Sequence, residues 1–352
     1  MRKRKGVTLK DVAEVTGVSI VTASKVLNFG DENVASAQTV KDIYEAADRL
    51  GYQKKNNLGH KRGGKISVGV LLLPRVENLS LHPFYNDIYN AIKGVADAED
   101  IYIDFFYSYY EIERNSFIQR RIIESNIDNL IIIGGKTDQF DRHFRNIVNI
   151  SFTEVQSFGQ CSIQFDMYSA VKDVISRLIA SRREKILYFG GGGNFRPGML
   201  NNDTVWREGA DGRETGFLDA HLESGRPLVM DQLYECSFQP EIAAEALRGR
   251  LAQGPRDFDA IFAGDDMVAL ACIKELQKHE IRIPDEVAIV GFNNQDFCRY
   301  TNPSLSTIEL NHRAAGVLAV ELLKMKNDQE ILPNMKLLIP CQFVKRHSCG
   351  LL

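Results

Sequence analysis

The chain has 352 residues, of which 44% are hydrophobic and 25% are charged, a composition typical of a globular protein rather than of a disordered or fibrous one. No apolar run approaches the roughly 18 residues that a membrane-spanning helix needs, and no apolar core of a signal peptide follows the basic start MRKRK. We therefore expect a cytoplasmic protein of two or three domains with no membrane partner.

The net charge of −3 hides an uneven distribution of charge along the chain. Residues 1–65 hold 13 Lys and Arg against 7 Asp and Glu, whereas the remaining residues hold 30 against 39. A basic segment suggests a polyanionic partner for that segment alone, because cations that neutralise phosphates gain free energy from counterion release. A solvated basic tail is the alternative.

Two short helical patterns flank a single glycine within residues 9–28. Thr8 can cap a first helix of about two turns, with Asp11 three residues on to complete a capping box. Gly17 then suits a left-handed turn, and Ser19 can cap a second helix. The pattern predicts two helices joined by a tight turn.

A third helical pattern is capped at Ser36 and reaches Leu50, where Gly51 ends it. Three short helices with one shared core predict a helix-turn-helix domain over residues 1–52. Such a fold places the start of its second helix in the major groove of DNA. A small helical bundle that binds another protein is the alternative.

The second helix carries most of the side chains that we expect to contact DNA. Lys25 can donate to guanine O6 and N7, and Ile20 or Val21 can pack on a thymine methyl group. Hydroxyl and amide side chains suit phosphate contacts. The predicted DNA-binding residues of the head are Thr8, Ser19, Ile20, Val21, Thr22, Ser24, Lys25 and Asn28.

Residues 53–65, QKKNNLGHKRGGK, have the polar, basic and glycine-bearing composition of a linker, so we expect a hinge there. From residue 66 onward, apolar runs alternate with segments of helical length, which predicts a doubly wound parallel α/β body of two lobes. We expect lobe 1 at about 66–160 and 293–323, and lobe 2 at about 161–292 and 324–352. A ligand of such a body lies at the carboxyl ends of the strands, between the lobes.

Catalytic and metal-binding patterns are missing from the body. The glycine run at 190–198 lacks the register of a nucleotide-binding loop, and neither a nucleophile elbow nor a Ser/His/Asp order occurs. The six cysteines form no C-x-x-C pair and no cluster with metal-ligand spacing. We expect no metal, no cofactor and no catalysis; an α/β enzyme with a DNA-binding head remains the alternative.

The segment TLKDVAEVTGVSIVTASKVLN (8–28), followed by a helix that ends in LGY (50–52), resembles the head of the lactose-repressor (LacI/GalR) family. The body resembles the family at HPFYNDIYNAIKGV (82–95), GRETGF (212–217), AIFAGDDMVAL (260–270) and 283–310. The head and its DRLGY junction look closest to the galactose-type and evolved-β-galactosidase-type repressors. Lys25 stands where the family has Arg and lacks the planar fork of Arg, so a different operator preference is expected.

The resemblance implies a hinge helix that orders on DNA and inserts a leucine into the minor groove, with Leu58 as the available residue. Gly59 follows Leu58, and a flexible tether is the alternative reading of this segment.

The resemblance also implies an effector site at Arg213, Asp265 and Asn293, the positions that match the family's R-x-x-G-F, N-D and G-F-D-D motifs. Asp and Asn have exchanged places relative to the family pattern. An Arg fork with a carboxylate and an amide suits the vicinal hydroxyls of a sugar. Phe84, Phe165 and Trp206 are candidate walls for an apolar sugar face, with a core role as the alternative.

Together these features predict a transcriptional regulator with an all-α helix-turn-helix head and a body that resembles periplasmic sugar-binding proteins. We expect a repressor that binds double-stranded operator DNA as a homodimer, since a two-fold protein matches a pseudo-palindromic site. A sugar or related metabolite should change its operator affinity. A corepressor-dependent regulator of the same family is the alternative.

Overall fold

The computed structural model describes residues 7–29, 34–50, 52, 66–74, 83–125, 127–135, 140, 143–152, 160–191, 211–226, 228–328 and 333–351. The expected hinge at 53–65 with Leu58, and the candidate wall Trp206, lie outside these residues. The side chain of Asn28 also lies outside the described part.

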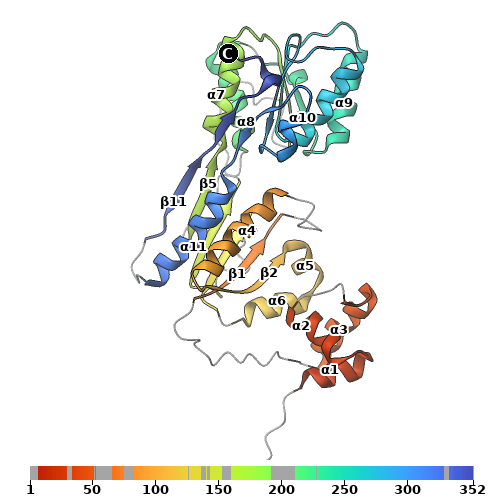
Figure 1. Cartoon of the computed structure of the whole chain (residues 1–352), viewed down its shortest axis with the longest axis vertical. Coiled ribbons are helices and arrows are strands. Elements are labelled where there is room, and N and C mark those ends of the chain that lie inside the picture. The colour runs from red at the N-terminus through yellow and green to blue at the C-terminus, as the bar shows by residue number, and fades with distance from the viewer. Residues whose placement is uncertain are drawn as a thin grey trace, which may run out of the picture.

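The head consists of α1 (Leu9–Thr16), α2 (Ile20–Phe29) and α3 (Ala37–Leu50), drawn in red and orange in Figure 1. The backbone N–H of Thr8 donates to the Asp11 carboxylate over 2.6 Å, and Gly17 takes the left-handed conformation with a φ of 68°. Both agree with the capping box and the turn that the sequence predicts. Val12, Val26 and Ile43 are buried together, one from each helix, so the three helices share a core.

Lobe 1 is built on a six-stranded parallel sheet in the order β11-β5-β4-β3-β1-β2 (Figure 1). Its strands are β1 (Ser67–Leu72), β2 (Tyr102–Ser108), β3 (Asn129–Ile133), β4 (Asn146–Ser151), β5 (Cys161–Asp166) and β11 (Lys336–Pro340). Its helices are α4 (Pro83–Ala98), α5 (Tyr109–Arg114), α6 (Ser116–Ile123) and α11 (His312–Asp328). Successive residues of β3 serve opposite faces, because Ile131 packs with α4 and α11 whereas Ile132 packs with α5 and α6.

Lobe 2 repeats this arrangement in the order β12-β10-β9-β8-β6-β7, parallel except for β12 against β10. Its strands are β6 (Ile186–Gly190), β7 (Leu233–Glu235), β8 (Ala260–Ala263), β9 (Ala288–Phe292), β10 (Ser306–Glu309) and β12 (Gln342–Val344). Its helices are α7 (Met167–Ala180), α8 (Gly212–Glu223), α9 (Pro240–Ala252) and α10 (Asp266–Lys278), with the 3₁₀ turns η3 (Met230–Gln232), η4 (Asp296–Arg299) and η5 (His347–Cys349). Helices on both faces explain why β6, β8 and β9 read as continuous apolar runs.

The structure divides the body differently from the lobe boundaries that we expected. Strand β5 pairs with β4 and β11 in lobe 1, whereas β10 pairs with β9 in lobe 2. Strand β11 pairs with β5 in lobe 1 as well, although we expected 324–352 in lobe 2. Strands β5, β10 and β11 are short and are not continuous apolar runs, and no local pattern encodes which sheet accepts a strand, so the sequence pattern could not place these elements.

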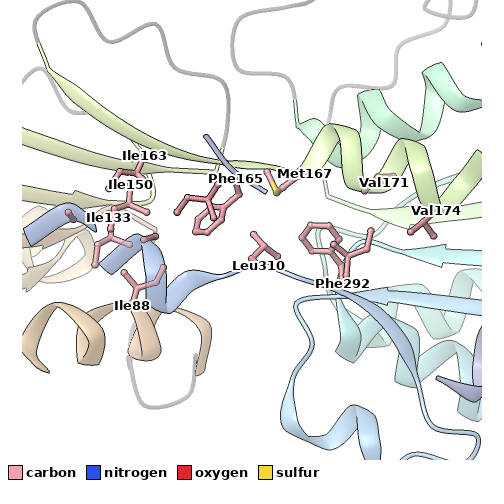
Figure 2. Close-up of a cluster of buried hydrophobic side chains, with 14 of the residues drawn as sticks. Ile88, Ile133, Ile150, Ile163, Phe165, Met167, Val171, Val174, Phe292 and Leu310 are labelled. Carbon is pink, nitrogen blue, oxygen red and sulfur yellow. The ribbon is translucent and has the colours of Figure 1, made fainter. Parts of the chain in front are cut away.

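The chain consequently crosses between the lobes after β5, after β10 and after β11. Figure 2 shows Phe165 and Met167 around the first crossing, Leu310 at the second, and Phe292 of lobe 2 nearby. All four side chains are at most 5% exposed and belong to one apolar cluster. The two lobes therefore share a core at their junction.

Candidate functional site

The start of α2 presents apolar and basic side chains on the surface of the head. Ile20 and Val21 are 50% and 65% exposed, and Lys25 is exposed as well, whereas Ala23 and Val26 on the same helix are fully buried. Exposed apolar residues at a helix start suggest a surface that a partner covers. The predicted base-contacting residues therefore lie together on one outward face.

The predicted phosphate-contacting residues lie near this face, but some have structural roles. Ser19 Oγ accepts the backbone N–H of Thr22 over 2.9 Å and lies 2.8 Å from Thr22 Oγ1, so both hydroxyls belong to the N-cap of α2. Thr8 Oγ1 donates to the Asp11 carboxylate over 2.7 Å. Ser24 is half-buried, on α2.

At the carboxyl end of the lobe 2 sheet, polar side chains from three elements converge. Asp265 follows β8 and caps α10, where its Oδ1 accepts the Met267 N–H over 2.7 Å. Asn293 follows β9 and donates from Nδ2 to Asp265 Oδ2 over 2.9 Å. Because these two side chains bond to each other, exchanging Asp and Asn between the positions preserves a carboxylate–amide pair. Arg213, at the start of α8, acts on Asp265 through its charge.

Asp211 holds the guanidinium of Arg213 in place. Arg213 Nε and Nη2 donate to the Asp211 carboxylate over 2.9 and 2.6 Å, and Nη1 donates to the Gly264 carbonyl over 2.8 Å. The two side chains are 14% and 16% exposed. The Cζ atom of Arg213 also lies 4.2 Å from the ring centroid of Phe238 and 5.2 Å from that of Phe292.

A guanidinium has five N–H donors, and these bonds occupy three of them. The two remaining N–H groups of Arg213 have no acceptor among the described residues. An Arg that is fixed by a carboxylate and still has donors to spare is preorganised to bind a polar ligand.

The charges at this site shift the acidity of its carboxyl groups. Burial raises the pKa of Asp211, but the positive charge and hydrogen bonds of Arg213 outweigh burial and leave that pKa below its ordinary value. For Asp265, burial dominates over the Met267 N–H and the charge of Arg213, so its pKa is raised.

The backbone turn after β9 sets the direction of Asn293. Asn293 and Asn294 both have positive φ, 107° and 51°, and the Asn293 N–H donates to the Ile308 carbonyl over 2.8 Å. Asn tolerates this left-handed region better than most residues. Behind the turn, Asp266 is fully buried and accepts from Thr307 Oγ1 over 2.6 Å and from the Gln295 N–H over 2.8 Å.

Lobe 1 contributes an aromatic cluster at the carboxyl end of its own sheet. The Phe84 ring lies 5.1 Å from Phe152 and 6.5 Å from Phe165, and Phe152 stacks on Phe165 at 5.7 Å. Phe165 is 5% exposed, whereas Phe84 and Phe152 are half-buried. Phe165 is therefore almost fully enclosed, whereas the two half-buried rings present more surface.

Tyr85 connects the two lobes electrostatically. Burial raises the pKa of its hydroxyl, and the positive charge of Arg213 in lobe 2 acts against that rise. Arg213 of lobe 2 and Tyr85 of lobe 1 therefore lie within electrostatic range of each other.

Sequence reasoning identified Arg213, Asp265 and Asn293, which the structure brings together, but missed Asp211, Phe238, Tyr85 and Phe152. Asp211 directly precedes the GRETGF motif, and Tyr85 directly follows Phe84. An acidic residue at a helix start two residues before an Arg was a usable signal for Asp211. No local pattern distinguishes Phe152 or Phe238 from core aromatics.

The described residues lack both a membrane-spanning helix and a metal-binding cluster. Every helix there is too short or insufficiently apolar to cross a membrane. The same residues include no group of three or more His, Cys, Asp and Glu side chains that could hold a metal ion.

Comparisons with solved structures place the fold. The chain is similar to the transcriptional regulator CelR in its complex with cellobiose, with a TM-score of 0.66 at 20% identity, covering 97% of this chain and 99% of that one. It is also similar to the lac repressor dimer bound to operator and the anti-inducer ONPF, with a TM-score of 0.64 at 20% identity, covering 98% and 99%.

Sequence comparisons agree over almost the whole chain. The chain is 23% identical to the HTH-type transcriptional repressor MelR of Bacillus subtilis (strain 168), covering 98% of each protein. It is 23% identical to catabolite control protein A of Priestia megaterium, covering 97% of this chain and 99% of that protein. A family model for bacterial regulatory proteins of the lacI family matches residues 8–55, and one for a periplasmic binding protein-like domain matches 175–349. The chain therefore carries a LacI-family head and a periplasmic binding protein-like body, and it is a DNA-binding transcriptional regulator.

Proposed function

We propose that this regulator is a repressor whose operator affinity changes when a sugar or related metabolite binds between its lobes, at Arg213, Asp265 and Asn293. The observation that carries the proposal is the state of Arg213, which Asp211 and the Gly264 carbonyl hold in place while two of its N–H groups lack an acceptor in the described residues. Adjacent sugar hydroxyls can accept from those donors and donate to the Asp265 carboxylate.

The surroundings of these groups favour a sugar over a purely apolar ligand. Asp265 and Asn293 already share one hydrogen bond, and their remaining lone pairs can take hydroxyl donors. The half-buried rings of Phe84 and Phe152 offer an apolar surface on the side of lobe 1. Among the solved relatives, CelR is described with cellobiose and an Enterococcus faecium regulator with ribose, which supports this class of ligand.

The coupling between ligand and DNA follows from the three crossings between the lobes. A ligand that contacts both lobes stabilises one of their relative orientations, and its differential affinity for the two states sets the change in operator affinity. We propose a cytoplasmic homodimer, nucleoid-associated when bound, that places two copies of α2 in successive major grooves. The lac repressor relative is described as a dimer on its operator, which supports this assembly.

A thermal-shift screen of sugars and sugar phosphates tests the ligand site. A hit should raise the Tm of the wild type and of Arg248→Ala but not of Arg213→Ala, because Arg248 is an exposed Arg that pairs with Glu275 on lobe 2. A sugar that stabilises all three proteins equally would show that it binds elsewhere.

A corepressor-dependent regulator has the same head and the same kind of ligand site, but its ligand strengthens operator binding instead of weakening it. The names of the relatives, which include repressor PurR and catabolite control protein A, do not say whether a ligand weakens or strengthens operator binding. That direction needs its own experiment. Operator binding measured with and without the hit decides it: weaker binding with the ligand supports induction, and tighter binding supports corepression.

A further inference from the structure

Helix α6 of lobe 1 contacts the head through an aromatic side chain. Phe117, the second residue of α6, packs against the apolar core of the head. Its ring lies 5.6 Å from that of Tyr44 on α3, and the two planes are inclined by 44°. In Figure 1, α6 lies beside α2 and α3. In the described part of the chain, Phe117 is the one side chain from outside the head that packs against that core cluster.

A second contact joins α6 to the carboxyl end of α2, the recognition helix that we expect to enter the major groove of DNA. Arg121 Nη1 donates to the backbone carbonyl of Leu27 over 2.9 Å, although the two residues are 94 positions apart. Leu27 lies in the last turn of α2, where carbonyl groups have no intrahelical partner and the helix dipole favours a cation. Helix α2 has no basic residue of its own in that turn. Lobe 1 therefore supplies the cation that the recognition helix lacks.

These contacts leave the DNA-facing surface of α2 uncovered. Ile20 and Val21 at the opposite end of the helix are 50% and 65% exposed in the same structure. A head that is held by the end of α2 can still present the start of α2 to a major groove. The contact is thus compatible with DNA binding.

We propose that α6 is a docking site for the head, which Phe117 and Arg121 hold in an orientation that favours operator binding. A head that is held only by a flexible tether loses orientational freedom when it binds DNA, and this loss weakens binding. A docked head has already lost part of that freedom, so its binding to DNA costs less entropy. Docking also makes the head move together with lobe 1. A movement of lobe 1 then changes the position of α2 directly, and not only through the hinge. The docking itself does not depend on which ligand binds between the lobes.

The experiment compares full-length variants of α6 by hydrogen exchange of the head and by fluorescence anisotropy with operator DNA. In F117A and R121A, the amides of α2 and α3 should exchange faster, and operator affinity should fall about five- to tenfold. R121K should keep most of the affinity, since Lys also donates to a carbonyl. I123A is the matched control, because Ile123 lies on the same helix and is 42% exposed.

Unchanged exchange in the head of both F117A and R121A would overturn the docking. Unchanged or tighter operator binding in variants whose head exchanges faster would overturn its role in favouring DNA. If F117A fails to fold, R121A carries the test, because Arg121 is only half-buried. The thermal shift caused by a sugar should be the same in these variants as in the wild type, so a failure here is distinct from a failure of the ligand site.

Discussion

Asp211→Asn tests whether one carboxylate organises the ligand site. Asp211 has two roles in the structure: it caps α8 by accepting the Arg213 N–H over 2.9 Å, and it pairs with the Arg213 side chain at 2.6 Å. Asn is also a good N-cap, so this substitution removes the charge and spares the cap. Asp211→Ala removes both.

The magnitude follows from the burial of the pair. Removing one partner of a fully buried ion pair costs about 3–5 kcal/mol, because the other charge stays buried and uncompensated. With side chains 14% and 16% exposed, and with one amide oxygen left to accept, we expect about 2 kcal/mol for Asp211→Asn. Loss of the cap adds about 1 kcal/mol, which gives about 3 kcal/mol for Asp211→Ala. A loss of 2 kcal/mol corresponds to a Tm lower by roughly 4 to 8 °C for a lobe of this size.

Thermal unfolding followed by circular dichroism measures these losses, with Asp166→Asn as the control. Asp166 caps α7 by accepting the Ser169 N–H over 3.0 Å and has no ion-pair partner in the described part of the chain, so its substitution should cost under about 0.5 kcal/mol. Equal Tm values for Asp211→Asn and the wild type would refute the view that Asp211 holds Arg213.

The pH dependence provides a second check on the same pair. The pKa of Asp211 is lowered in the fold, so its contribution to stability is complete above its unfolded pKa of about 3.9 and is lost as pH falls through the folded value. The Tm difference between wild type and Asp211→Asn should therefore be constant from pH 8 to pH 5 and narrow below about pH 4.

Three further predictions concern other parts of the chain. Lys25→Ala should weaken selective operator binding by about 1–3 kcal/mol and leave the Tm unchanged; equal discrimination between operator and random DNA in anisotropy titrations would contradict a base contact. Gly216→Ala should destabilise lobe 2 by about 1–3 kcal/mol, since a Cβ there would lie 2.6 Å from the Tyr168 carbonyl oxygen, whereas Gly249→Ala, with open space around it, should not lower the Tm. Burial raises the pKa of Asp266 to about 7, so this group should make the protein less stable as pH rises from about 4 to 7, and Asp266→Asn should flatten that slope in pH-dependent melts.

Much of the local structure was determined by the sequence alone, because it depends on residues close together in the chain. Thr8 with Asp11 and the left-handed Gly17 set the boundaries of α1 by hydrogen bonds and backbone preference within a few residues. The apolar runs predicted a parallel α/β body, since a strand covered on both faces is mostly apolar. The motifs also located Asp265 and Asn293 just after two such strands, and Arg213 at the start of α8.

The tertiary structure decided which distant segments meet. Strands β5 (CSIQFD) and β10 (STIE) both mix apolar and polar residues, and only their pairing with β4 and β9 assigns them to different lobes. The influence of Arg213 on Tyr85 and the bond from Arg121 to Leu27 join residues far apart in sequence. Such contacts depend on how packed layers are oriented in three dimensions, and no spacing along the chain encodes that orientation. The sequence thus determined the helix-turn-helix head and the polar residues of the ligand site. Tertiary packing decided how lobe 1 faces the ligand site and how it holds the head.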